Sequence, residues 1–395
     1  MCAAVNAPRY EGELYADEAI ANPVPHYAAM RALGPVVYIP QLDNYALTHH
    51  QTVKDALRKH ADFISGEGVS ADAFGSSFQR GNIVASDPPR HTAMRKAMLP
   101  TLMPKSIEGL RENFERLADD LVTALVAGDE FDAISDFASF LPLTVVRDLI
   151  GLPEFGKQNM LKWAGAAFDV AGIQNERGQR GVEAIHEMRA FVSEYLTADG
   201  VKPGSWSSRV FDLVASGKLP SDLAPFVIRD YINPSLDTTI SAIGHLIRLL
   251  SDNPDQWQML RANPDLARTA ISEAIRLGTP IRSFSRIAAR DLDVSGVTIP
   301  AGSRVMMLFA SANRDEAVFA NPDQFDITRT VTDHLGFGHG IHTCVGMHLA
   351  QMEIMSLIRA MIPLVATIET GDAVPVMNNT ICGFANLPTR FHAVP

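Results

Sequence analysis

The chain has 395 residues, of which 47% are hydrophobic and 20% charged, so it can bury a large core and is neither disordered nor fibrous. Its 34 basic and 45 acidic residues give a net charge of −11, which makes nucleic-acid phosphate an unfavourable partner. Its cysteines, Cys2, Cys344 and Cys382, are too few for a disulfide framework. No apolar run is long enough to span a membrane and no signal-peptide pattern precedes residue 10, so we expect a cytoplasmic protein without a membrane partner.

Helical periodicity dominates the chain. Apolar residues at steps of three and four predict helices over residues 106–127, 222–250, 265–277 and 346–361. Short strands are predicted at 36–39, 45–48, 294–299 and 305–309, the last two joined as a hairpin by a turn at 300–302. Because no repeat or low-complexity linker interrupts this pattern, we expect residues 1–395 to form a single domain. The predicted fold class is mainly α with small β-hairpin sheets.

The strongest chemical pattern lies around Cys344, which three glycines precede and Gly346 follows. Such a density of glycine lets a backbone bend closely around a flat or bulky group. A helix is predicted to begin just after Cys344, and its N-terminal N–H groups would favour a thiolate. The residues alone leave three interpretations: a buried structural cysteine, a zinc site with His339 and His342, or a thiolate ligand of heme iron. The spacing fits no common zinc pattern.

The stretch Phe337-Gly-His-Gly-Ile-His-Thr-Cys344-Val-Gly346 resembles the cysteine loop of cytochrome P450 monooxygenases. The resemblance implies the cytochrome P450 fold in a single heme domain. It also implies heme b (iron protoporphyrin IX), with Cys344 as the ligand of the iron. A thiolate raises the electron density on iron, and N–H groups that donate to the sulfur moderate this effect.

A second motif, Glu273-Ala-Ile-Arg276, places two opposite charges on one helical face. From the residues alone it could be a surface ion pair of little energetic consequence. The resemblance implies instead a buried structural clamp, completed by an arginine from the loop before the cysteine. The best match for that arginine is Arg329.

Basic residues are predicted to hold the heme propionates, which need cationic donors. His91 and Arg95 lie four residues apart and would share one helical face, which could also be a solvated basic surface. The resemblance assigns both to the propionates and matches Arg286 and His342 to two further propionate partners.

The segment Asn233-Pro-Ser-Leu-Asp237-Thr238 matches the acid–alcohol motif of the family's long distal helix. The resemblance implies that Asp237 and Thr238 are the catalytic residues that deliver protons. Pro234 cannot donate a hydrogen bond to the carbonyl of Asp230, so we expect the helix to open there, where the family holds dioxygen and water. The alternative is a new helix that begins with Asn233 as its cap and Pro234 as its first residue.

The electron source must lie outside the chain, because no dinucleotide-binding motif follows a predicted strand. The resemblance implies electrons from NAD(P)H through a separate ferredoxin or flavin/iron–sulfur reductase, with O2 as co-substrate. Arg90, Arg95, Lys96 and Lys105 are predicted to form a basic cluster on the cysteine side that attracts such an acidic carrier.

The overall pattern is similar to bacterial cytochromes P450 that oxidise or O-demethylate small aromatic compounds. Phenylalanines in the segments that line the family's pocket would form apolar walls, although each could be plain core: Phe74, Phe78, Phe168 and Phe384. Glu67 occupies a position where benzoate-oxidising members carry a basic residue, and Asp230 follows Arg229 directly. We therefore expect a neutral substrate and O-demethylation of a methoxyphenol such as guaiacol.

Three other functions stay open at this point. One is hydroxylation of another small hydrophobe, such as a terpenoid or an alkyl-arene. Another is a non-enzymatic heme-thiolate ligand sensor, which would not need the proton-delivering pair Asp237 and Thr238. The third is a peroxygenase, which would need neither that pair nor an electron donor.

Overall fold

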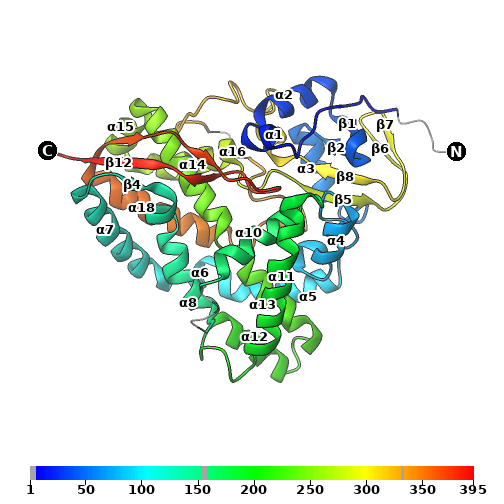
Figure 1. Cartoon of the computed structure of the whole chain (residues 1–395), viewed down its shortest axis with the longest axis horizontal. Helices are drawn as coiled ribbons and strands as arrows, with labels where there is room; N and C mark the ends of the chain where they lie inside the picture. The colour runs from blue at the N-terminus through cyan, green and yellow to red at the C-terminus, as the bar shows by residue number, and fades with distance from the viewer. Residues whose placement is uncertain (1–5, 154–155, 157, 331–332) are drawn as a thin grey trace.

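The computed structural model describes residues 6–153, 156, 158–330 and 333–395. Helices make up most of it, and the small sheets lie along one side, with the two chain ends at opposite extremes (Figure 1). The predicted fold class, mainly α with small sheets, is confirmed. Cys2 and residues 331–332 of the stretch before the cysteine loop lie outside the described residues.

The helices of the described part cover most of the chain between residues 17 and 364. They are α1 (Asp17–Ala21), α2 (Val24–Leu33), α3 (His50–Arg58), α4 (Ala73–Gln79), α5 (Arg90–Leu102), α6 (Pro104–Ile107), α7 (Arg111–Ala127), α8 (Arg147–Ile150), α10 (Met160–Val170), α11 (Glu176–Tyr195), α12 (Trp206–Ala215), α13 (Ala224–Ile232), α14 (Asp237–Asp252), α15 (Pro254–Ala262), α16 (Ala267–Gly278), α17 (Phe309–Ala312) and α18 (Met347–Leu364). Two π-helical segments, Ala133–Ala138 and Pro142–Val146, follow α7.

Two of the predicted helices are divided. The segment 106–127 contains the end of α6 and a 3-10 turn at Glu108–Leu110, and α7 begins only at Arg111. The segment 222–250 is split into α13, which ends at Ile232, and α14, which begins at Asp237. Pro234 has no N–H group for the helical ladder, so the chain leaves the helix in this four-residue stretch.

The strands form four small sheets in the described part of the chain. They are β1 (Val36–Ile39), β2 (Asn44–Leu47), β3 (Phe63–Ile64), β4 (Phe131–Asp132), β5 (Phe284–Ala288), β6 (Leu292–Val294), β7 (Val297–Ile299), β8 (Arg304–Met307), β9 (Val365–Thr370), β10 (Val374–Pro375), β11 (Phe384–Asn386) and β12 (Pro388–Ala393). The largest sheet has the order β1-β2-β8-β5-β3, in which β2 and β8 are parallel and the other neighbours antiparallel.

The predicted hairpin of residues 294–299 with 305–309 is wrong. Residues 294–299 contain the end of β6, a turn at Ser295 and Gly296 with positive φ, and all of β7, which pairs with β6. The strand β8 pairs instead with β5 and β2. The local pattern of apolar residues could not distinguish these partners, because the preferred neighbours of β8 lie up to 260 residues away in the chain.

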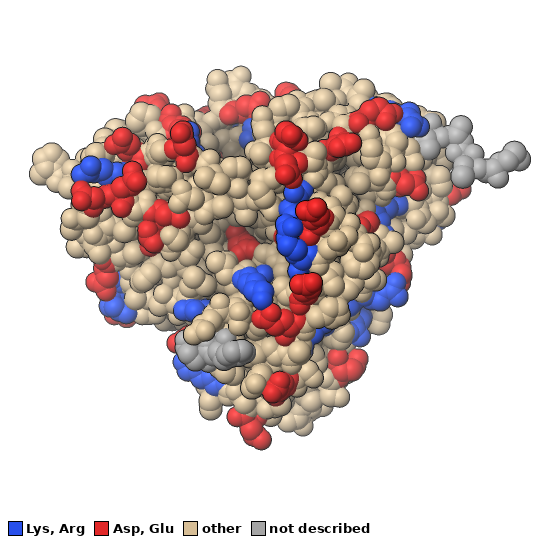
Figure 2. All heavy atoms as spheres, in the orientation of Figure 1, with Lys and Arg blue, Asp and Glu red and all other residues tan. Residues whose placement is uncertain are grey.

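The main hydrophobic core surrounds α14, α18 and α7, with fully buried side chains such as Phe114, Ile247 and Leu357. A smaller core lies under the five-stranded sheet and includes Leu47, Val305 and Leu335. The loop that carries Cys344 leads directly into α18, so its position is set by the main core. On the molecular surface, acidic and basic side chains alternate over the face seen in Figure 2.

Candidate functional site

The loop around Cys344 is shaped by glycines and short backbone hydrogen bonds. The N–H of Cys344 donates to the carbonyl of Phe337 at 2.9 Å. Gly338 and Gly340 have φ of +66° and +72°, a region that disfavours side chains. A Cβ at Gly340 would also lie 2.3 Å from the carbonyl oxygen of Leu57, so this close approach to α3 requires glycine.

Cys344 itself lies just before the N-terminus of α18. Cys344 keeps exposed surface, but the protein around its sulfur displaces water and raises the pKa of the thiol. The N–H groups of Gly346 and Met347, which point to the sulfur, and the charge of Arg95 lower this pKa to a smaller extent. N–H groups directed at a sulfur stabilise its thiolate form. The loop therefore presents a sulfur ready to bind a cation.

The four residues predicted to hold propionates come together from α5, β5 and the cysteine loop. The rings of His91 and His342 pack at 4.4 Å between centroids. Burial lowers the pKa of His342, and the nearby charges of Arg286 and Arg95 lower it further. Burial lowers the pKa of Arg95, and the charge of Cys344 opposes this effect, so this arginine lies within electrostatic reach of the sulfur.

This cationic group lacks acidic partners. Among the described residues, neither Arg95 nor Arg286 has a carboxylate within ion-pair distance, and Arg286 donates only to the carbonyl of Ser285, at 2.7 Å. Burial lowers the pKa of Arg286 to about 10. The Nε2 atom of His91 is buried without a hydrogen-bond partner. Buried donors of this kind fit an anionic group that lies beside a thiolate-bound cation, which is the chemistry of heme propionates and iron.

The zinc interpretation does not fit the geometry. Within residues 6–153, 156, 158–330 and 333–395, no group of three or more His, Cys, Asp or Glu side chains is arranged to hold a metal ion. His339 instead accepts a hydrogen bond from Arg58 at 3.0 Å, on the outer side of the loop.

The predicted clamp is confirmed. The Glu273 carboxylate accepts two hydrogen bonds of 2.7 Å from Arg276 and one of 2.9 Å from Arg329. All three side chains are at most 9% exposed. Arg276 also donates to the carbonyls of Asn313 and Pro322, so the clamp ties α16 to the segment that leads into the cysteine loop.

The predicted basic cluster does not form a single surface patch. Arg95 faces the sulfur of Cys344 and is half-buried, whereas Arg90 lines a cavity elsewhere and stacks on Phe226 at 4.7 Å. Lys96 and Lys105 are the members that stay exposed. The prediction was wrong because residues 90, 95 and 96 point in different directions around α5.

Asp237 and Thr238 form the first turn of α14, directly after the break. The Thr238 hydroxyl donates to the carbonyl of Pro234 at 2.9 Å, and the Ser235 hydroxyl donates to that of Tyr231 at 2.6 Å. These side chains take the place of missing backbone donors, which is how a helix tolerates an opening. Asn233 is the C-cap residue that follows α13, and α14 begins only at Asp237 after Leu236, so the alternative with Asn233 as the N-cap of a new helix is wrong.

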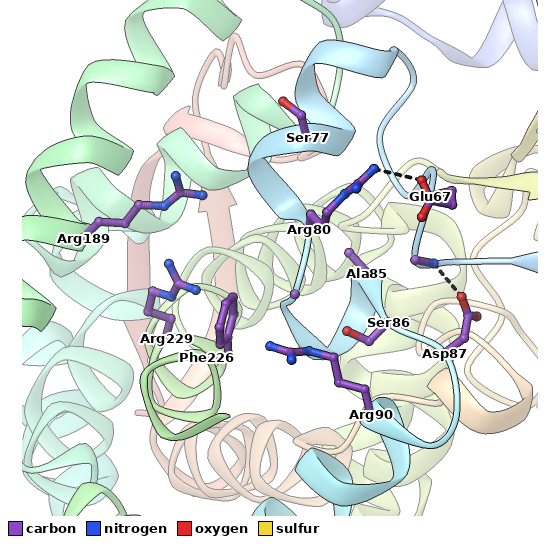
Figure 3. A pocket seen from close by; sticks show the side chains of 12 residues that line it. Glu67, Ser77, Arg80, Ala85, Ser86, Asp87, Arg90, Arg189, Phe226 and Arg229 are labelled. Atoms are coloured by element: carbon purple, nitrogen blue, oxygen red, sulfur yellow. Dashed lines mark hydrogen bonds and ion pairs between the residues drawn. The ribbon is translucent and has the colours of Figure 1, made fainter. Parts of the chain in front are cut away.

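A cavity of about 750 Å³ lies between α4, α11 and α13, with the start of α5 at its edge (Figure 3). Its charged lining residues are four arginines and two acids, Arg80, Arg90, Arg189, Arg229, Glu67 and Asp87. Both oxygens of Asp87 accept backbone N–H groups, from Ser65 at 3.0 Å and Gly66 at 2.8 Å. Arg80 forms an exposed ion pair with Glu67 at 2.8 Å.

Arg189 and Arg229 differ from the other two arginines of the cavity, because no carboxylate of the described residues lies within 4.0 Å of them. Arg189 donates to the carbonyl of Phe78 at 2.5 Å, and Arg229 stacks on Phe226 at 4.4 Å. The Nε atoms of both are buried without a partner. Burial lowers the pKa of Arg229 to about 10, and repulsion by Arg189 adds to this effect.

The expected pairing of Arg229 with Asp230 is absent. The Asp230 carboxylate instead accepts the N–H of Ile83 at 2.7 Å, and its charge opposes the larger effect of burial on the pKa of Arg229 only in part. Neighbours in a helix project about 100° apart, so adjacency in the sequence did not make them partners. The cavity is therefore more cationic than the sequence suggested.

None of the four predicted pocket phenylalanines is among the residues that line the main cavity. Phe74 and Phe78 pack together at 5.0 Å on α4, and Phe78 lines a small second cavity beside Arg189 and Arg229. Phe168 is buried in α10, and Phe384 packs on His245 at 4.9 Å. The aromatic ring that lines the main cavity is Phe226, which the sequence interpretation missed, as it missed Arg189. No local motif marks either residue.

Comparison with known proteins agrees with the geometry. The sequence profile of the family "Cytochrome P450" matches residues 29–161 and 230–391. The chain is 34% identical to cytochrome P450 CYP199A2 of Rhodopseudomonas palustris over 95% of this chain and 92% of that protein. It is 30% identical to linalool 8-monooxygenase of Pseudomonas putida over 84% and 86% of the two chains. The structure matches that of Mycobacterium marinum cytochrome P450 CYP268A2 in complex with pseudoionone, with a TM-score of 0.87 and 26% identity over 98% and 100% of the two chains.

In the part of the chain that the structure describes, no helix is long and apolar enough to cross a membrane. Cytochromes P450 use heme b and receive electrons from NAD(P)H through a redox partner. The profile match covers well over half of the sequence, and two relatives that are at least 30% identical align over most of the chain. The chain therefore belongs to the cytochrome P450 family of monooxygenases.

Proposed function

We propose that this cytochrome P450 oxidises a small aromatic carboxylate, with O-demethylation of a methoxybenzoate as the reaction. The observation that carries the proposal is the pair Arg189 and Arg229, which share one cavity without an acidic partner among the described residues. Burying a guanidinium without a counter-charge costs free energy, which an anionic ligand would recover through charge-assisted hydrogen bonds. The ring of Phe226 offers a flat apolar surface beside them.

The sequence favours a neutral methoxyphenol such as guaiacol, and that substrate is the second candidate. Its remaining support is the ion pair of Glu67 with Arg80, which neutralises one cation at the cavity. Its other support depended on an Arg229–Asp230 pair, which the geometry lacks. Hydroxylation of a terpenoid is supported by the similarity to linalool 8-monooxygenase and to cytochrome P450-terp, but by no feature of the cavity. A sensor role would leave Asp237 and Thr238 without a function.

Heme b fits the residues of the cysteine side. We assign Cys344 to the iron and His91, Arg95, Arg286 and His342 to the propionates, in accord with their mutual proximity and missing acidic partners. When bound, the heme supplies the oxidant, made from O2 with two electrons that come from NAD(P)H through a ferredoxin or flavin/iron–sulfur reductase.

The chain's own task is to place the substrate and to move protons. Arg189 and Arg229 would hold the carboxylate and so direct the methoxy group away from the cavity wall. Asp237 and Thr238, at the opening of the distal helix, would deliver the two protons that the reaction consumes. The balance is one methoxyarene, O2, two electrons and two protons in, and one phenol, one formaldehyde and one water out.

We also propose that residues 1–395 act as one heme domain in the cytoplasm. The free thiols Cys344 and Cys382 and the need for a reduced electron carrier support that compartment.

Titration of the ferric holoenzyme with a matched pair of ligands tests the substrate class. 4-Methoxybenzoate and 4-methoxybenzamide have nearly the same shape and differ in charge, and guaiacol is added as the neutral phenol. We expect the benzoate to shift the iron to high spin with an affinity at least about tenfold higher than that of the amide, because a hydrogen bond to a charged group contributes about 1.5–3 kcal/mol. Turnover should yield formaldehyde and 4-hydroxybenzoate in equal amounts.

Tighter binding of guaiacol or of the amide than of the benzoate would reject the anionic substrate and restore the neutral one. Tighter binding of a monoterpene alcohol than of every arene tested would reject both.

A further inference from the structure

The helix α10 crosses the first turn of α14 and leaves room there for the side chain of Asp237. Gly165 makes this possible, since a Cβ at that position would lie 3.3 Å from Oδ2 of Asp237. The carbonyl of Gly165 accepts a hydrogen bond of 2.9 Å from Asn378, which fixes this part of α10. Asp169 lies one helical turn further along α10, on the same face as Gly165.

Asp169 is held in place by the loop before β11. The backbone N–H of Asn379 donates to Oδ1 of Asp169 at 2.9 Å, and the Asn379 side chain donates to the carbonyl of Asp169 at 2.9 Å. Within the described residues, Oδ2 of Asp169 has no hydrogen-bond donor. One oxygen of a rigidly placed carboxyl group therefore stays available.

Asp237 has a second carboxyl group beside it, not a cation. No lysine or arginine of the described residues lies within 4.0 Å of the Asp237 carboxylate. Burial raises its pKa to about 7, and the negative charge of Asp169 contributes. Burial also raises the pKa of Asp169 to about 6, against the opposing effects of the Asn379 N–H and of Arg177 and Arg180.

The charged groups around Asp169 lead to the surface. Arg177 and Arg180 belong to the first turns of α11, where Arg177 pairs with Asp17 at 2.5 Å and Arg180 is exposed and lies 3.8 Å from Glu176. Asp169 and Asp237 are both half-buried, and Asp169 lies within electrostatic reach of Asp237 on one side and of the arginines at the start of α11 on the other.

We infer that Asp169 is a proton-relay residue that passes protons from solvent at the start of α11 to Asp237. Each step transfers one proton: from water to the Asp169 carboxylate, from the Asp169 carboxyl group by way of water to the Asp237 carboxylate, and from Asp237 onward to Thr238. No electron or co-reactant is needed beyond those of the monooxygenase reaction. Asp169 acts through Asp237 and is not itself a catalytic residue.

Two neighbouring carboxyl groups suit this task. Like charges disfavour double ionisation, so the pair retains a proton at a pH where a lone aspartate would have lost it. A donor is most efficient when its pKa lies near the working pH. A cation beside Asp237 would do the opposite and keep it ionised.

The variants Asp169→Asn and Asp169→Glu test the relay, with the exposed Asp212→Asn as matched control. Asparagine keeps an oxygen for the Asn379 N–H, so the fold is retained while the proton site is lost. Carbon-13 NMR of the CO-bound ferrous holoenzyme, labelled at the aspartate carboxyl carbon, follows Asp237, whose signal is assigned by its loss in Asp237→Asn. We expect the Asp237 midpoint to fall by about one pH unit in Asp169→Asn and to stay unchanged in Asp212→Asn.

The second measurement is the yield of product per NAD(P)H from pH 6 to 9, with whichever arene is turned over. Asp169→Asn should divert most reducing equivalents to hydrogen peroxide above neutral pH, and Asp169→Glu should restore product. An unchanged Asp237 midpoint, or a parental yield at every pH in Asp169→Asn, overturns the relay. The relay requires only the monooxygenase reaction. If the benzoate proposal fails, both measurements can still be made with another substrate, and their results still test the relay.

Discussion

Arg276 and Arg329 share the carboxylate of Glu273, whereas Arg189 and Arg229 face a cavity with no carboxylate of the described residues beside them. The first pair donates to fixed acceptors of the fold, and the second pair keeps buried Nε atoms without a partner. Both groups contain the same residue type at similar depth. Their partners therefore distinguish a structural role from a ligand-binding role.

The cysteine side follows the same rule. Arg95 and Arg286 also lack acidic partners in the described part of the chain, and there the family provides the ligand, because heme b carries two propionates. We propose that the unpaired arginines of these two groups each bind an anion. The heme propionates would pair with Arg95 and Arg286 permanently. The substrate carboxylate would pair with Arg189 and Arg229 in each turnover.

The largest effect is expected at the residue that fixes the cofactor. In Cys344→Ser, the reduced CO-bound enzyme should lose the red-shifted Soret band of a thiolate ligand, and turnover should fall to background. Cys382→Ser should keep both, because Cys382 lies near His245 and not beside the cationic group of the cysteine side. A parental spectrum in Cys344→Ser would contradict the assignment.

Mutation of the clamp residue Glu273 should lower the stability of the fold. Glu273→Gln leaves two buried arginines without a counter-charge, which should lower the free energy of unfolding by about 3–5 kcal/mol. Arg229→Gln removes a charge that has no partner, so its unfolding free energy should stay within about 1 kcal/mol of the parent. Urea unfolding of the holoenzyme measures both, and equal losses would remove the distinction between the two groups.

A smaller effect is expected for Asp237. A carboxyl group whose pKa is raised from 3.8 to about 7 in the folded chain stabilises the fold below pH 4 and loses this contribution as the pH rises to 7. Asp237→Asn should therefore become more stable relative to the parent between pH 5 and pH 8, by roughly 2 kcal/mol. A difference that is constant over this range would show that Asp237 ionises normally.

The sequence predicts those parts of the site that are local in the chain. The cysteine loop and Glu273-Ala-Ile-Arg276 are contiguous motifs, and Pro234 indicates a disturbed helix because it lacks an N–H. The complete loss of helix at residues 233–236 was not predictable, since it depends on side chains such as Ser235 bonding to the backbone. The hairpin was assigned wrongly because β8 has distant partners.

The cavity was harder to predict, because its walls come from helices far apart in sequence. Arg189 and Phe226 carry no motif, and they meet only when α11 packs near α13. Arg229 could be identified from the sequence, but the adjacent Asp230 suggested an ion pair between the two. In the structure, the Asp230 carboxylate accepts the N–H of Ile83 instead. Charge in a buried site depends on which side chains face each other, and adjacency in the sequence does not determine this.

The most direct measurement is the ratio of the dissociation constants of 4-methoxybenzamide and 4-methoxybenzoate, taken in the parent enzyme and in Arg229→Gln by the spin-state shift. If Arg229 holds the substrate carboxylate, the variant should bind the benzoate about 10- to 100-fold more weakly and the amide nearly as before, so the ratio should fall by that factor. An unchanged ratio would contradict the claim that the unpaired arginines of the cavity bind an anionic substrate.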